Sequence, residues 1–126
     1  MITRHEVTLT TNASGAATGY TPPVSGFVHA ITYTPPGTNA LATGADITVT
    51  GETGKHAIVT ITNLGTSAVA VYPRAATASV ANAASLYAAG GAAVNDRIPV
   101  ANERVKIVIA EGGDTKTGTF HVYIAE

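Results

Sequence analysis

Four histidines, His5, His29, His56 and His121, are the side chains best suited to metal binding or proton transfer. Their spacing contains neither a His-x-His pair on a strand nor an i, i+4 pair on a helix, which are the usual arrangements of metal ligands. The chain has no Cys, which excludes thiolate metal sites and disulfides. We therefore expect no metal and no cofactor, and we interpret each histidine as a surface or interface side chain.

Motifs for nucleophilic or phosphate chemistry are also incomplete. No Gly-x-Ser-x-Gly occurs, so no serine is singled out as a nucleophile. The segment 51–56 contains Gly54-Lys55, but a phosphate-binding loop would need Gly at Val49 and Ser or Thr at His56. We expect no catalytic residues and no enzymatic activity; a small enzyme would need a Ser/His/acid cluster that the sequence does not select.

Charge is scarce and unevenly placed. The 126 residues carry seven basic and eight acidic side chains, 12% of the chain, with a net charge of −1. No basic cluster exists for nucleic acid or an anionic membrane, and no apolar run is long enough for a spanning helix. Residues 7–45 and 75–95 contain no Asp, Glu, Lys or Arg. Two interpretations fit these stretches: a Thr-rich surface that hydrates without charge, or a surface covered by protein, because interface cores are depleted of charge. We favour the second.

Apolar and polar residues alternate with a period of two along most of the chain, which is typical of strands that are buried on one face. In segment 26–33 the odd-numbered side chains are expected on one face: Phe27, His29, Ile31 and Tyr33. Two later strands are expected to share a core through Val105, Ile107, Ile109, Phe120, Val122 and Ile124. About eight strands with Gly and Pro between them predict an all-β fold, a single-domain antiparallel β-sandwich that is jelly-roll-like.

The jelly-roll prediction requires two long connections, at 11–25 and at 74–96. The second contains ten Ala between residues 75 and 94, so the domain 1–126 has a long Ala-rich connection at about 75–96. One or two helical turns are compatible with Ser79 as a cap and Gly90 as a terminator. Loops of this length in compact domains tend to be functional, and we expect this one to become ordered against a neighbouring subunit.

Several segments resemble the small virion proteins of tailed bacteriophages, in particular the jelly-roll capsid decoration (cement) proteins. The resemblance lies in the low charge, the Ala/Thr/Gly richness, and the segments 26–33, 46–51, 72–74 and 98–119. It implies a bacteriophage structural protein that binds and stabilises a capsid. The implied partner is the major capsid protein or another virion protein, in a homo-oligomer with a trimer favoured, and no nucleic acid or membrane is bound.

The implied location is the virion, assembled in the host cytoplasm, which agrees with the absence of a signal-peptide pattern in residues 1–6. The alternative is a glycan- or receptor-binding β-sandwich module of a phage tail or surface protein, which would need a polar cleft lined by tyrosines. In either case the interface is predicted at aromatic, aliphatic and proline side chains: Tyr20, Pro22, Pro23, Val80, Leu86 and Tyr87.

Overall fold

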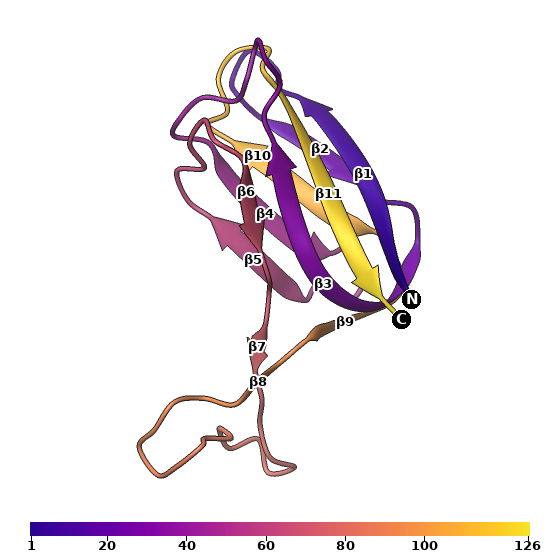
Figure 1. Ribbon diagram of the computed structural model, residues 1–126, viewed down its shortest axis with the longest axis vertical. Helices are drawn as coiled ribbons and strands as arrows, with labels where there is room; N and C mark the ends of the chain where they lie inside the picture. The colour runs from indigo at the N-terminus through magenta and orange to yellow at the C-terminus, as the bar shows by residue number, and fades with distance from the viewer.

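The computed structural model describes residues 1–126 and consists of strands and loops (Figure 1). It has no helix that could span a membrane. The first sheet contains β1 (Ile2–Thr10), β11 (Thr117–Ala125), β3 (Val24–Thr34) and β6 (Val69–Val71), and β9 (Ile98–Glu103) also pairs with β3. The second sheet contains β2 (Ala17–Tyr20), β10 (Val105–Ala110), β4 (Asp46–Gly51) and β5 (Ala57–Ile61). A separate pair is formed by β7 (Ala75–Ala76) and β8 (Asn95–Asp96).

The prediction of an all-β, jelly-roll-like sandwich is confirmed. β6 and β9 occupy one position beside β3, because β6 pairs with the half around Ile31–Tyr33 and β9 with the half around Val24–Val28. When β6 and β9 are counted as one interrupted strand, eight strands remain. Their order is β1-β11-β3-β6/β9 in one sheet and β2-β10-β4-β5 in the other, which is the strand order of a jelly roll. All strand pairs are antiparallel.

The strand count differs from the predicted eight because the interrupted position and the small β7–β8 pair raise it to eleven. The segment 11–25 also differs from the prediction of a long connection. It contains β2, which pairs with β10 through residues Ala17–Tyr20. Asn12 bends the chain toward this strand, since its Oδ1 accepts the backbone N–H groups of Ser14 and Ala16.

The core lies between the two sheets, and its largest contributions come from the inner strands β3, β4, β10 and β11. The six side chains predicted to share it are all buried: Val105, Ile107, Ile109, Phe120, Val122 and Ile124. Tyr33 packs against Phe120 with a distance of 5.2 Å between ring centroids. Burial of such apolar side chains is the main source of stability in a domain of this size.

The prediction of one shared face for segment 26–33 is wrong at Phe27. Tyr123 pairs with Ala30 and the next residue, Ile124, pairs with Val28, so His29 is an extra residue in β3. Such a β-bulge reverses the alternation of faces on its two sides. Ile31 and Tyr33 are therefore buried, whereas Phe27 is exposed.

Candidate protein-binding arm

Residues 74–97 form an arm that projects from the sandwich between β6 and β9 (Figure 1). The stem of the arm is the antiparallel pair of β7 and β8, in which Ala75 faces Asp96 and Ala76 faces Asn95. None of the residues 74–97 is buried. The arm therefore leaves the middle of an edge strand and contributes nothing to the hydrophobic core.

Two arginines fix the base of the arm to the sandwich. Nη1 of Arg74 donates to the backbone oxygens of Pro73, at 2.7 Å, and His29, at 3.3 Å. On the returning chain, the guanidinium of Arg97 lies 4.5 Å from the centroid of the Phe27 ring, within the range of a cation–π contact. The β-bulge that exposes Phe27 thus supplies the ring on which Arg97 rests.

Beyond the stem, Thr77, Ser85 and Val94 join three segments of the arm. The backbone N–H and the hydroxyl of Thr77 both donate to the backbone oxygen of Val94, at 2.9 and 2.8 Å. The N–H of Ser85 donates to the oxygen of Thr77, and the N–H of Val94 donates to the oxygen of Ser85. Thr77, Ser85 and Val94 are also partly shielded, unlike nearly all of the arm. No pattern in the sequence indicated this junction.

The first lobe of the arm, residues 78–84, is a tight turn and not the helical turn considered above. Oγ of Ser79 accepts the N–H groups of Ala81 and Ala83 at 3.3 Å, and Asn82 adopts a left-handed backbone with φ of 59°. Ser79 therefore caps a turn, a role that competes with helix formation. Val80 at its tip is fully exposed.

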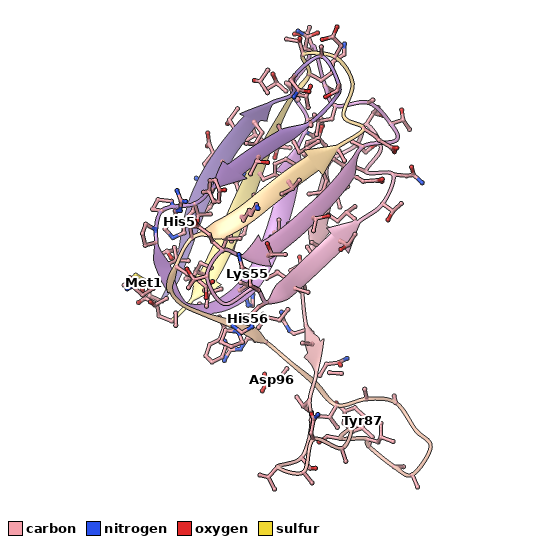
Figure 2. All side chains as sticks on the ribbon, turned by 180° about the vertical axis from the view of Figure 1, so that it is seen from behind. Met1, His5, Lys55, His56, Tyr87 and Asp96 are labelled. Carbon is pink, nitrogen blue, oxygen red and sulfur yellow. The ribbon has the colours of Figure 1, made fainter.

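The second lobe, residues 86–93, is a short hairpin closed by the pairing of Leu86 with Ala93. The N–H of Tyr87 donates to Ala92, and Gly90 takes a left-handed φ of 71°. Tyr87 is 76% exposed and lies well away from the sandwich (Figure 2). Val80, Leu86 and Tyr87 thus form an exposed apolar set on the arm, although nothing in the structure tests their predicted role in an interface.

The other predicted interface residues lie on the sandwich, at the end of β2 and directly after it. Pro22 and Pro23 are exposed, and Tyr20 is 38% exposed. The guanidinium of Arg104 lies 3.9 Å from the centroid of the Tyr20 ring and is held there by an ion pair with Glu52. One face of Tyr20 is therefore engaged within the fold, and the structure does not bring this group together with the apolar set on the arm.

The four histidines occupy separate places. His5 lies in β1 beside Thr3, His29 is the bulge residue of β3, and His121 lies 3.3 Å from the carboxylate of Glu6. His56 follows the β4–β5 turn (Figure 2). No three His, Asp or Glu side chains are close enough together to hold a metal ion.

Comparison with known proteins gives few matches. No family model matches the chain, and no curated protein is significantly similar in sequence. Among solved structures, the chain is similar to FlhE, described as "Crystal Structure of FLHE", with a TM-score of 0.47 and 9% sequence identity over 99% of this chain and 98% of that chain. A likeness at this level assigns no activity, partner or location to the chain.

The predicted resemblance to capsid decoration proteins is corrected: no family model and no curated virion protein matches the chain, and the solved structure that matches it over its whole length is FlhE. The assignments that depended on the resemblance are therefore wrong. They are the capsid-stabilising role, the phage tail or surface module given as its alternative, the capsid or virion protein partner with its trimeric arrangement, and the virion location.

Proposed function

We propose that the chain is a non-catalytic protein-binding module that attaches to another protein through the arm of residues 74–97. The observation that carries this proposal is that no residue of the arm is buried, although no charged side chain occurs between residues 75 and 95. Segments that remain in water usually carry charge, whereas the cores of protein interfaces are depleted of it.

The internal order of the arm supports binding rather than a role as a flexible linker. The junction of Thr77, Ser85 and Val94 holds both lobes in defined positions through backbone hydrogen bonds. An arm that is ordered before binding loses less conformational entropy when it docks. Its ten alanines present a small, apolar and uncharged surface. The surface that receives it is therefore expected to be an uncharged groove of a partner protein.

The apolar set of Val80, Leu86 and Tyr87 supplies the anchors for this contact. Tyrosine is among the residues that most often dominate binding energy at interfaces, and Tyr87 is the only aromatic residue of the arm. Val80 and Tyr87 lie on different lobes, so the partner groove must contact both lobes at once to bury them.

An armless variant tests the proposal. Because Ala76 pairs with Asn95, the dipeptide NG can replace residues 77–94 and close the stem as a two-residue hairpin. In cells that express the chain, a photo-crosslinker at position 87 should capture a partner protein. The same crosslinker at position 114, in a distant exposed turn, is the control and should not capture that protein. The partner is then purified and titrated with the intact chain and the armless variant.

The expected result is that the armless variant folds with an unchanged urea midpoint and binds the purified partner at least about 100-fold more weakly. Tyr87→Ser alone should weaken binding about tenfold, as for a typical interface anchor. Equal affinity of the intact and armless chains for that partner contradicts the proposal.

A further inference from the structure

The two sides of the sandwich, where the edges of the sheets face one another, are closed to different extents. On one side β1 and β2 lie against each other, and Val7 and Leu9 of β1 are buried. Gly19 of β2 allows this approach, because a Cβ built on it would lie 2.2 Å from Cδ2 of Leu9. The core on the β1–β2 side is therefore sealed by the chain itself.

On the opposite side, the outermost strands are β5 in one sheet and β6 in the other (Figure 1). Their inward-facing side chains pack on the core but remain partly exposed: Val59, Ile61, Val69 and Val71. Their inward direction follows from the register. Val59 and Ile61 pair with the buried Val49 and Ile47, and Val69 and Val71 pair with the buried Tyr33 and Ile31. We call these four half-buried side chains the open seam.

The strands that border the open seam lack charge and proline, two of the features that normally protect sheet edges, although β6 has only three residues and β5 has an extra residue, Ile58, at a β-bulge. Edge strands are commonly guarded by charged side chains or by proline. β1 carries Arg4 and Glu6, and β9 carries Pro99. In contrast, residues 56–73 contain no Asp, Glu, Lys or Arg, and neither β5 nor β6 contains proline. The outer N–H and C=O groups of β5 are thus free for pairing.

We infer that the open seam accepts an extended segment of a partner protein, which adds as a strand to the free edge of β5. Because β5 has five residues and β6 only three, β5 offers the longer row of backbone groups. A segment with alternating apolar and uncharged polar residues can pair with β5 and place its apolar side chains on the seam. Strand addition of this kind combines backbone hydrogen bonds for affinity with alternate side-chain pockets for specificity.

The chemistry of the seam identifies the occupant as a strand and not a helix or a charged surface. A helix has no free backbone groups to pair with the edge of β5. A charged segment would bury its charge against Val59 and Ile61 without any opposite charge between residues 56 and 73 to balance it. The open seam belongs to the sandwich and not to the arm, so binding to it can be tested with the intact chain.

The test uses the acetylated peptide TVTITVT with a two-lysine tail for solubility, and TSTSTST with the same tail as the control. The first peptide should bind the intact chain saturably and slow amide exchange in β5 about tenfold or more, whereas the control should do neither. Ile61→Lys puts a charge on the seam and should weaken binding at least about tenfold. Thr18→Lys adds the same charge to β2, the opposite edge strand of the same sheet, and should leave binding within about twofold.

Val69→Lys, on β6, gives the same expected loss and keeps the test decisive if Ile61→Lys does not fold. The inference is overturned if TVTITVT shows no saturable binding, or if Thr18→Lys weakens binding as much as the seam variants. Sedimentation of the intact chain supplies a further outcome. A dimer that Val69→Lys or Ile61→Lys converts to a monomer would show that a second copy fills the seam, which also overturns it.

Discussion

Oε1 of Glu103, at the end of β9, accepts the backbone N–H of Gly54 at 2.9 Å, so that one side chain holds the turn between β4 and β5. The same oxygen accepts the N–H of Thr53 at 3.0 Å. A Cβ on Gly51 would lie 2.6 Å from this oxygen, which explains glycine at that position. The N–H of Gly54, together with that of Thr53, holds the pKa of the Glu103 carboxyl below its usual value, against the opposing effect of burial.

Replacing this carboxylate should destabilise the whole domain. Glu103→Gln keeps the size of the side chain but weakens both charge-assisted hydrogen bonds to the turn. We expect the free energy of unfolding to fall by about 1–3 kcal/mol, measured by urea denaturation at neutral pH. Glu111→Gln, at an exposed turn residue, is the control and should change nothing. Equal midpoints for the two variants would contradict the assigned role of Glu103.

The lowered pKa of Glu103 also predicts a dependence of stability on pH. A carboxyl whose pKa is lower in the folded state stabilises the protein above the unfolded pKa, about 4.3 for Glu, and this contribution is lost as the pH falls through the folded pKa. The intact chain should therefore lose stability progressively below about pH 5. The difference in urea midpoint between the intact chain and Glu103→Gln should shrink as the pH falls below this value. A constant difference would show that the carboxylate charge is not involved.

Tyr33 should tolerate the loss of its hydroxyl. Its side chain is buried, no group satisfies hydrogen-bond geometry with the hydroxyl, and burial raises its pKa, with a smaller opposing effect of the Leu41 backbone. Removal of an unsatisfied buried polar group is neutral or stabilising. Tyr33→Phe should therefore leave the free energy of unfolding within about 0.5 kcal/mol or raise it. Phe120→Ala, which removes the ring that Tyr33 packs on, should cost about 3–5 kcal/mol.

Gly19→Ala should open the sealed side of the sandwich. The new Cβ would meet Cδ2 of Leu9 at 2.2 Å, so the Leu9 side chain must move, at an expected cost of about 1–3 kcal/mol. Gly37→Ala is the matched control, because no atom lies within 4 Å of the Cβ built there. In a Leu9→Ala background the effect of Gly19→Ala should be much smaller. Additive effects of the two changes would indicate that Gly19 is needed for another reason.

Thr77→Val should loosen the arm without affecting the sandwich. The variant keeps the backbone hydrogen bond to Val94 and loses the hydroxyl bond at 2.8 Å. We expect amide exchange of Ser85 and Val94 to become about fivefold faster, which corresponds to a loss of about 1 kcal/mol. The urea midpoint should be unchanged, and Thr18→Val on β2 should leave exchange in the arm unaffected. Cooperative loss of the sandwich with the arm would contradict their separation.

The core could be predicted from the sequence because its signal is local. The alternation of apolar and polar residues along 105–109 and 120–124 indicates which side chains face inward. A sheet that is buried on one face requires this period of two. The connection at 74–96 could be located for a similar reason, since its composition has neither strand alternation nor charge.

Features that depend on pairing between distant residues could not be predicted. The extra residue at His29 is defined only by its register with Tyr123 and Ile124 of β11. The stacking of Arg104 on Tyr20 and the junction at Thr77 join residues whose types permit many other partners. The open seam also has no local signature. The residues of β5 and β6 alternate as in any half-buried strand, and only the order of strands in the sheets shows that no further strand lies beside them.

The shared position of β6 and β9 beside β3 has a consequence for how this fold can change. Both ends of the arm are anchored in the same sheet position, and its stem residues Ala75 and Asp96 face each other. Segments of different length or sequence can therefore be exchanged between these two residues while every core side chain keeps its neighbours. The sandwich is therefore a scaffold whose projecting segment can be replaced, by natural selection or by protein engineering, without redesign of the rest of the domain.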